Sequence, residues 1–178
     1  MKKDPETRRK AILDSALEIL YFEGLEKFTL DRIAEKAGVS KGGLLHHFRT
    51  KDELIREVIK YLFDEFEKQV EEEFQRTEGK AKWIKAYTKV SMKEEYPKGI
   101  AKAFLYALSN VPGVMDIVNE DTRKWLNRFA SEEVNLARAI IIKMAVDGFI
   151  SESAYSEEVM RFKEEFFKEI YQLIESWL

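Results

Sequence analysis

Residues 29–54 constrain the fold of this chain more than any other stretch, because they hold two short helical patterns separated by only a few residues. The apolar residues of the first pattern recur at helical spacing and are Leu30, Ile33, Ala34 and Ala37. Gly38 follows directly, and glycine readily adopts the left-handed conformation that ends a helix. Ser40 can then cap a second helix over residues 41–48. This order of cap, helix, glycine turn and helix predicts a helix-turn-helix.

The second of these helices carries two consecutive glycines, Gly42 and Gly43, in its first turn. Each glycine lowers helix stability by about 0.5–1 kcal/mol relative to alanine. A recognition helix, however, needs its first turn close to the base edges of DNA, and glycine has no side chain to hold the backbone away. The pattern therefore favours DNA binding, although a capped helical hairpin with a loosely held second helix would fit the same spacing.

The segment GVSKGGLLHHFRTKDEL, residues 38–54, resembles the signature of the TetR family of one-component transcriptional regulators. The usual family pattern is G-V-S-K-G-T-L-Y-x-H-F-x-S-K-E-x-L. The matching positions are Gly38, Val39, Ser40, Lys41, Gly42, Leu44, His47, Phe48, Lys51 and Leu54. Two positions differ, since Gly43 replaces a common threonine or serine and Leu45 replaces a tyrosine that commonly reaches a phosphate. The resemblance implies operator binding through this motif, with contacts rearranged at those two positions.

We expect the DNA contacts to come from polar, charged and glycine residues of the motif. The expected DNA-binding residues are Thr29, Arg32, Ser40, Lys41, Gly42, Gly43, His46, Arg49 and Lys51. A lysine such as Lys51 in the first turn of a helix opposes the helix dipole, which suggests that it binds a phosphate instead. Arg8, Arg9 and Lys10 could also reach the DNA backbone or could simply be solvated. Residues 1–51 hold 11 Lys or Arg against 8 Asp or Glu, and the remaining residues hold 19 against 25, so positive charge is concentrated around the motif.

Composition argues against several other classes of protein. The absence of cysteine excludes disulfides and thiolate chemistry. No glycine-rich phosphate loop is present, and the adjacent His46 and His47 would point about 100° apart on a helix, so they cannot chelate one metal. We therefore expect no enzyme activity, no cofactor and no metal site. With no signal-like N-terminus and no apolar run of about 18 residues, we expect a cytoplasmic protein without a membrane partner.

The pattern along the rest of the chain predicts an all-α protein, because no alternating apolar runs or hairpin turns occur. Thr50 and Glu53 form a capping box that opens a helix of about 25 residues, or about 37 Å, ending near Gly79. Such a helix would join an N-terminal three-helix DNA-binding head to a C-terminal helical body for ligand binding and dimerisation. We assign residues 1–51 to the first domain and residues 52–178 to the second. The predicted helices are 5–23, 30–37, 41–48, the long helix from 51, 80–95, 98–110, 114–130, 132–151 and 156–178.

The last two predicted helices carry more apolar residues than packing within one subunit requires. Two apolar stripes run along residues 156–178, and residues 139–146 are apolar nearly all round apart from Lys143. Deep burial within one chain would be the alternative, but the family resemblance implies a four-helix homodimer interface. The expected interface residues are Ile141, Phe162, Phe166, Ile170, Leu173 and Trp177.

Large apolar residues lie on the helices between the long connector and the expected dimer helices. Aromatic residues and methionines at helical spacing are usually core, but the resemblance implies an enclosed inducer in this region. An apolar lining would suit a small lipophilic or aromatic effector. The expected ligand-binding residues are Trp83, Tyr87, Phe104, Leu108, Trp125, Phe129, Met144 and Phe149.

Together these features predict a ligand-responsive transcriptional regulator, most simply a repressor. As a homodimer it would bind a palindromic double-stranded DNA operator, and a small apolar effector would release it. The alternative is a DNA-binding protein of the same fold that is controlled by a protein partner.

Overall fold

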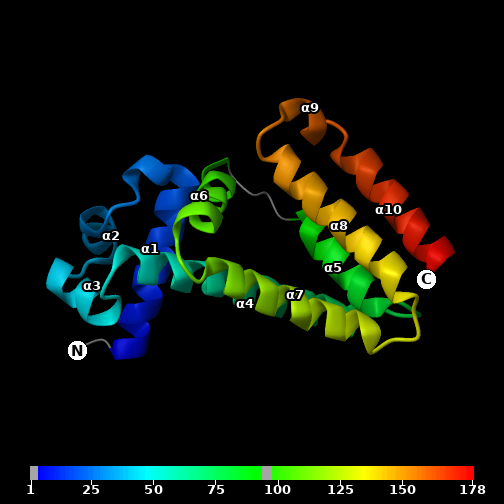
Figure 1. The fold of residues 1–178 in the computed structure, drawn as a ribbon, viewed down its shortest axis with the longest axis horizontal. Helices are drawn as coiled ribbons and strands as arrows, with labels where there is room; N and C mark the ends of the chain where they lie inside the picture. Colours follow the sequence, from blue (N-terminus) through cyan, green and yellow to red (C-terminus); the bar gives the residue numbers. More distant parts are fainter. Residues whose placement is uncertain (1–3, 94–97) are drawn as a thin grey trace. The chain divides into compact units, whose positions relative to one another are not determined.

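The computed structural model describes residues 4–93 and 98–178, and within them all regular structure is helical (Figure 1). The elements are α1 (Pro5–Phe22), a 3-10 turn η1 (Leu25–Lys27), α2 (Leu30–Ala37), α3 (Lys41–His47), α4 (Lys51–Arg76), α5 (Lys82–Lys93), α6 (Lys98–Asn110), α7 (Val114–Ala130), α8 (Leu136–Ser153), α9 (Glu157–Met160) and α10 (Lys163–Trp177). The predicted all-α fold, with an N-terminal helix-turn-helix and a C-terminal helical body, is confirmed. Residues 94–95, expected to end the helix now seen as α5, lie outside the described residues.

The chain forms two compact units. Unit 1 takes in Met1–Leu62 and Pro97–Ile117, and unit 2 takes in Phe63–Tyr96 and Val118–Leu178. Both α4 and α7 begin in unit 1 and end in unit 2. The predicted domains, residues 1–51 and 52–178, were divided by expected function and not by compact packing. That division stays a prediction.

Unit 1 is built around the buried face of α1, against which α2 packs. Local signals fix the helix-turn-helix: the Thr29 hydroxyl accepts a hydrogen bond from the Arg32 N–H at 3.2 Å. Gly38 ends α2 in the left-handed region at φ 66°, and the Ser40 hydroxyl caps α3 by accepting from the Gly43 N–H at 3.0 Å. The fully buried side chains include Ile12, Ile19, Phe28, Ile33, Leu44, Phe48 and Leu54. Burial of this set holds the two short helices at a fixed angle.

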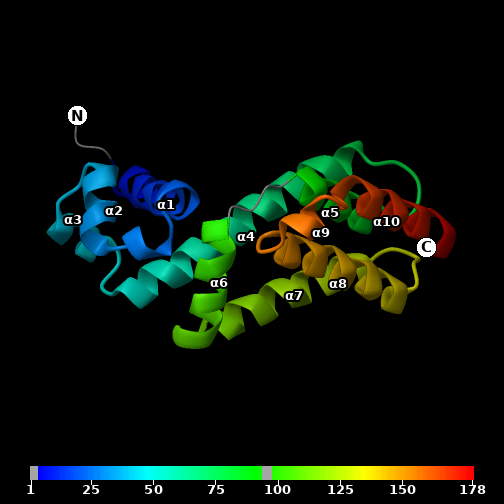
Figure 2. The same ribbon diagram turned by 90° about the horizontal axis from the view of Figure 1, so that it is seen from above.

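Unit 2 contains three mutually packed helices, α5, α8 and α10, which run side by side in both ribbon views (Figures 1 and 2). The last turns of α4 and much of α7 complete this unit. Its core is apolar and includes Val70, Ile84, Val90, Trp125, Phe129, Ile142, Val146, Phe167, Ile170 and Ile174.

The predicted start of α8 was wrong. The helix expected from residue 132 begins at Leu136, because the Asn135 side chain caps it by accepting from the Arg138 N–H at 3.2 Å. The Glu132 carboxylate instead accepts hydrogen bonds from the Lys82 and Trp83 N–H groups at 2.8 and 2.9 Å. Glu132 therefore caps α5, which is distant in sequence.

The helix predicted over residues 156–178 is interrupted, since it forms α9 and α10. Ser156 caps α9 by accepting from the Val159 N–H at 3.2 Å. The Phe162 N–H then bonds to the Val159 carbonyl, three residues back, at 3.0 Å. This tighter turn ends the regular helical hydrogen-bond pattern before α10 begins. No glycine or proline marks the break.

Candidate DNA-binding surface and effector region

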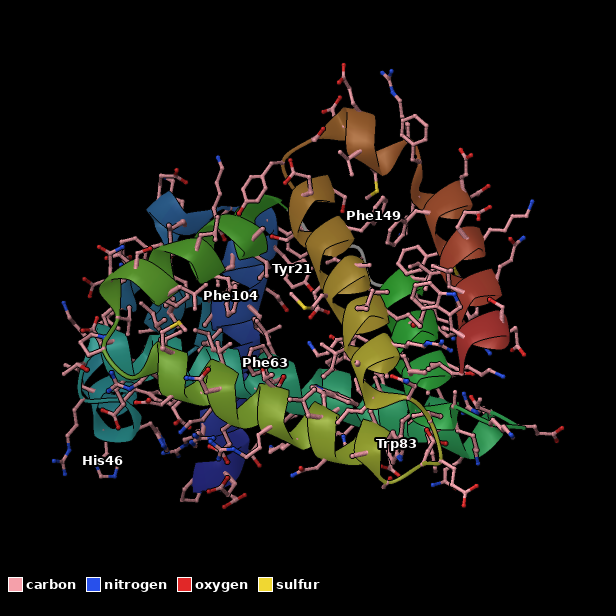
Figure 3. The ribbon with its side chains drawn as sticks, turned by 45° about the vertical axis from the view of Figure 1, so that its right-hand side comes forward. Tyr21, His46, Phe63, Trp83, Phe104 and Phe149 are labelled. Carbon is pink, nitrogen blue, oxygen red and sulfur yellow. The ribbon has the colours of Figure 1, made fainter. Side chains whose placement is uncertain are left out.

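The helix-turn-helix exposes most of the residues expected to contact DNA. Thr29, Ser40, Lys41, Gly42, His46 and Arg49 are exposed, whereas Arg32, Gly43 and Lys51 are partly covered. In Figure 3 the labelled His46 points away from the helices around it. Leu44 is fully buried and anchors α3 from its opposite face. The motif thus presents one polar face of α3 on a rigid apolar base.

Arg32 differs from the other expected contacts, because carboxylates already surround its guanidinium group. Its Nε and Nη2 donate to the two carboxylate oxygens of Glu23, both at 2.9 Å, and its Nη1 donates to Glu35 at 2.9 Å. These bonds raise the pKa of Arg32, and the same pairing lowers the pKa of Glu23. Arg32 therefore ties the start of α2 to the end of α1.

The remaining cations of the motif have fewer acidic partners than Arg32. Lys41 pairs with Asp31 at 3.0 Å, but both side chains are more than half exposed, so water or a phosphate can replace this contact at little cost. Lys51 places its Nζ 5.7 Å from the centre of the Phe28 ring. The Arg49 backbone N–H donates a hydrogen bond to the Glu53 carboxylate at 2.8 Å. This bond does not involve the Arg49 side chain.

The two glycines of α3 have different surroundings. A Cβ atom at Gly42 would have no neighbouring atom within 4 Å. A Cβ atom at Gly43 would lie 3.2 Å from the Ser40 hydroxyl that caps the helix. A side chain would therefore crowd the helix cap at position 43 and meet open space at position 42.

Arg9 positions α3, a role that its sequence context did not reveal. Its guanidinium lies 5.4 Å from the centre of the Phe48 ring, at the end of α3, and it forms an ion pair with Glu57 of α4. Arg9 thus connects α1 to both α3 and α4 within unit 1. The basic run of residues 8–10 is visible in the sequence, but the pairing of Arg9 with Glu57 is not.

Three of the expected ligand-binding residues come together in unit 2. Tyr87, Trp125 and Phe129 form an aromatic cluster with Phe66 of α4, and ring centres are 4.9 Å apart for Tyr87 and Trp125 and 5.2 Å apart for Phe66 and Tyr87. Phe129 lies 6.0 Å from Tyr87 in the same edge-to-face manner. Phe66 was not among the expected ligand-binding residues, although its spacing on the long helix placed it on the buried face.

A tryptophan pair holds Arg128 at the edge of this cluster. The guanidinium carbon lies 4.7 Å from the Trp83 ring centre and 4.9 Å from that of Trp125. Arg128 Nη2 donates to Glu67 at 2.6 Å, while its buried Nη1 has no hydrogen-bond partner among the described residues. Trp83 also stacks on Phe74 at 3.8 Å.

The other expected ligand-binding residues lie elsewhere. Phe149 of α8 stacks on Phe166 of α10, with ring centres 4.2 Å apart. Met144 is 68% exposed. Phe104 and Leu108 are half-buried residues of α6 in unit 1, unlike the six in unit 2.

A group of ionisable side chains borders the aromatic cluster and was not anticipated as a site. The Tyr87 hydroxyl donates to Asp147 at 2.6 Å, and Lys143 donates to the other oxygen of the same carboxylate. Only 13% of the Lys143 side chain is exposed, and its Nζ lies 5.2 Å from the Tyr87 ring centre. The isolated Lys143 within an apolar run and the acid four residues later were the available sequence signals.

Asp121 of α7 is the second acid of this group. Burial raises the pKa of its carboxyl group to about 6, and the nearby charges of Lys143 and Lys124 only partly counter that effect. Each of these lysines forms an ion pair with another acid, Lys143 with Asp147 and Lys124 with Glu67. No ion pair reaches Asp121 from the side chains that the structure describes.

The expected dimer residues show a range of exposure. Ile170 is only 4% exposed and belongs to the core of its own subunit. Phe166 and Leu173 are half-buried. Ile141, Phe162 and Trp177 are exposed by 53%, 60% and 37%.

Two other kinds of site are absent from residues 4–93 and 98–178. No group of three or more histidine, cysteine or acidic side chains there could hold a metal ion. None of the helices in the same ranges is long and apolar enough to cross a membrane.

An exposed helix-turn-helix on a helical body defines a DNA-binding transcriptional regulator, and comparison with known proteins agrees. The family model for bacterial regulatory proteins of the tetR family matches residues 12–58, and the model for the tetracyclin repressor-like C-terminal domain matches residues 81–178. The chain belongs to the TetR family of transcriptional regulators.

Curated relatives match part of the chain. SrpR, an HTH-type transcriptional regulator from Pseudomonas putida, is 41% identical over 56 residues, which cover 32% of this chain and 26% of that protein. RutR from Escherichia coli K12 is 30% identical over 119 residues, covering 65% of this chain and 55% of RutR. The matches thus span well under two thirds of these relatives.

Solved structures share the fold over nearly the whole chain. A transcriptional regulator from Rhodococcus sp. Rha1 superposes with a TM-score of 0.74 at 20% identity, covering 94% of this chain and 96% of that one. FadR from Bacillus subtilis, solved in complex with stearoyl-CoA, gives a TM-score of 0.65 at 15% identity, covering 90% and 96%.

Proposed function

We propose that this protein is a homodimeric repressor that binds a palindromic operator and releases it when a small apolar or aromatic effector binds. The observation that carries the proposal is Gly42, which has no packing reason to be glycine yet lies in the first turn of an exposed helix preceded by an intact cap. Close approach of the backbone to the major groove gives that glycine a purpose.

The proposed DNA contacts are the exposed polar residues of the motif together with the partly covered Lys51. Lys41, His46, Arg49 and Lys51 provide cationic or hydrogen-bonding side chains, with Thr29 and Ser40 beside them. Arg32 has a supporting role, because Glu23 and Glu35 already satisfy its guanidinium group. Phosphate contacts of this kind position the motif, and base contacts from α3 select the sequence.

Homodimerisation is supported by an uncharged stripe along α8. Ala137, Ile141, Met144 and Gly148 follow helical spacing, and all four are exposed. A Cβ atom at Gly148 would meet no atom within 4 Å, so the stripe is open for a second helix to approach. Exposed Phe162 and Trp177 would extend this seam onto α10.

Selection from a random double-stranded DNA library tests the operator-binding part of the proposal. The full chain should enrich an inverted repeat with half-site centres separated by about 34–36 Å or a multiple of that distance. Arg49→Ala should weaken binding to the selected site, whereas Arg76→Ala, a change of an exposed cation at the far end of α4, should not. Enrichment of a single asymmetric half-site would contradict the proposal.

The response to an effector rests on the aromatic cluster of unit 2 and on likeness to ligand-binding relatives, such as the FadR structure solved with stearoyl-CoA. Control by a protein partner is the second candidate, because an exposed apolar stripe could also serve a different protein. Mass spectrometry of natively purified protein separates the two: a co-purifying small molecule favours an effector, and a stoichiometric second polypeptide favours the partner.

A further inference from the structure

The short helix α3 depends on its surroundings for its orientation. It has only seven residues, two of them glycines, and isolated helices shorter than about 12 residues are marginally stable in water. Ser40 caps its start, while the buried side chains of Leu44 and Phe48 anchor its middle and its end. A contact that holds Phe48 therefore also helps to fix the direction of the residues that α3 presents to DNA.

Arg9 supplies such a contact from α1. Its guanidinium carbon lies 5.4 Å from the centre of the Phe48 ring, and its Nη2 donates to the Glu57 carboxylate of α4. The Arg9 side chain is 36% exposed and the Glu57 side chain 24%, so water only partly screens this ion pair. Glu57 also pairs with Lys60 at 2.9 Å, so its carboxylate would keep a partner if Arg9 were replaced.

A second polar contact joins α1 to α4 one helical turn further along α4. The Tyr61 hydroxyl donates to Asp14 at 2.7 Å, and the Lys10 Nζ donates to the Tyr61 hydroxyl at 2.9 Å. Glu57 and Tyr61 are four residues apart, so both contacts lie on the same face of α4. Arg9 and Lys10 thus bond to α4, although the sequence alone would also allow contacts with the DNA backbone.

From these contacts we infer that Arg9 is a positioning residue for operator recognition, which acts through Phe48 and Glu57 and not through a phosphate. Loss of Arg9 should let the end of α3 shift, so base contacts in the major groove would weaken more than the attraction to phosphates. Operator affinity should therefore fall more than affinity for random DNA. This inference rests on the proposed operator binding and names a residue that makes the binding selective.

A phosphate contact by Arg9 is the alternative, and salt dependence distinguishes the two roles. Each lost phosphate contact makes the salt slope shallower by about 0.9. We expect Arg9→Ala to lower operator affinity by about tenfold with an unchanged slope, which is the scale of one cation–π contact and one partly buried ion pair. The matched control is Arg56→Ala, because Arg56 bonds the Pro112 carbonyl at 3.0 Å, on the α6–α7 turn of unit 1. This control should leave operator affinity and selectivity unchanged.

Glu57→Gln separates positioning from a simple effect of charge. Removing an acid makes the chain more positive by one charge, which alone would tighten binding to any DNA. Because the change also releases Arg9, we expect operator affinity to fall by about threefold to tenfold, while affinity for random DNA stays unchanged or rises. Glu26→Gln, at an exposed acid of η1, makes the same change in charge and should not lower operator affinity.

Hydrogen exchange of the full chain without DNA gives a readout that does not depend on the proposed function. Amides of α3 should exchange at least about threefold faster in Arg9→Ala than in the wild-type chain, and Arg56→Ala should leave their exchange unchanged. Arg9→Lys keeps a charge near Glu57 but loses the planar group over Phe48, so its α3 exchange and operator affinity should be intermediate. Arg9→Lys carries the test if Arg9→Ala does not fold.

A shallower salt slope in Arg9→Ala, with equal losses on operator and random DNA, would assign Arg9 to a phosphate and overturn the inference. Wild-type operator affinity in both Arg9→Ala and Glu57→Gln would overturn it as well, and so would unchanged α3 exchange in Arg9→Ala. A wild-type chain that selects no operator would instead contradict the proposed function. The exchange measurement would still decide whether Arg9 orders α3.

Discussion

At the scale of single residues, alanine substitution of the two glycines of α3 should change stability by different amounts. Gly42→Ala adds a methyl group in open space, so it should raise the free energy of unfolding by about 0.5–1 kcal/mol and weaken operator binding. Gly43→Ala would crowd the Ser40 cap at 3.2 Å, which should cancel most of that gain in stability. Urea denaturation and fluorescence anisotropy with a selected operator measure both effects. Full operator affinity in Gly42→Ala would show that the glycine has another purpose.

Lys51 provides a residue-scale test of phosphate contact. The logarithm of DNA affinity should fall with the logarithm of salt concentration by about 0.9 per neutralised phosphate, so Lys51→Ala should make the slope shallower by about one unit. Arg32→Ala is the informative comparison, because Arg32 is held by Glu23 and Glu35 and should affect stability more than the slope. A slope that Lys51→Ala leaves unchanged would remove this residue from the interface.

Asp121 should make stability depend on pH in an unusual direction. Its folded pKa of about 6 lies above the ordinary 3.8, so the folded state holds more protons than the unfolded state between these values. The free energy of unfolding should therefore fall as pH rises from about 4 to about 6. Asp121→Asn should remove this component, of order 1 kcal/mol after solvent screening, and stabilise the protein above pH 6. Thermal unfolding of both proteins from pH 4 to pH 7.5 measures the difference.

The sequence reveals residues whose role depends on near neighbours and hides those whose role depends on distant ones. Thr29, Gly38 and Ser40 act on backbone groups within five residues, so their caps and turn could be predicted. The charges that affect the pKa of Asp121 come from α4, α7 and α8. No local sequence pattern predicts that the lysines near Asp121 already form ion pairs with Asp147 and Glu67.

At the scale of elements, the same distinction explains which helices were placed correctly. The bounds of α2 and α4 follow from their caps and periodic apolar faces. The start of α8 was wrong because Glu132 caps α5, a contact across about 50 residues of sequence. The break between α9 and α10 could not be predicted, because no glycine or proline lies there.

The exposed stripe of α8 leads to an element-scale prediction about assembly. Met144→Glu places a carboxylate in the proposed apolar seam, where it would lack a partner, and should convert dimers to monomers. Ile170→Glu is a poor test, because Ile170 is 4% exposed and its replacement would unfold the subunit. Asn127→Glu adds the same charge on α7, outside the proposed seam, and serves as the control. Light scattering after size-exclusion chromatography should find Met144→Glu monomeric and folded; an intact dimer would place the interface elsewhere.

At the scale of the whole molecule, α4 offers a continuous mechanical connection. It begins at Lys51, directly after the helix-turn-helix, and its later turns carry Phe66 into contact with Tyr87 and Trp125. A straight helix of 26 residues is about 39 Å long, and we expect a ligand that displaces the aromatic cluster to shift the turns of α4 that carry Phe66. Close-packed interiors pass such displacements on rather than absorbing them.

The resulting prediction is that effector and operator oppose each other reciprocally. If tilting α4 changes the spacing of the two recognition helices in a dimer, the effector lowers operator affinity, and the operator must lower effector affinity by the same factor. The coupling free energy should be about 1–3 kcal/mol, or about 5-fold to 150-fold in affinity. The measurement is effector affinity with and without saturating operator, with scrambled DNA as the control. Equal affinities would mean that a small molecule bound in unit 2 does not regulate DNA binding. Control by a protein partner would then explain regulation better.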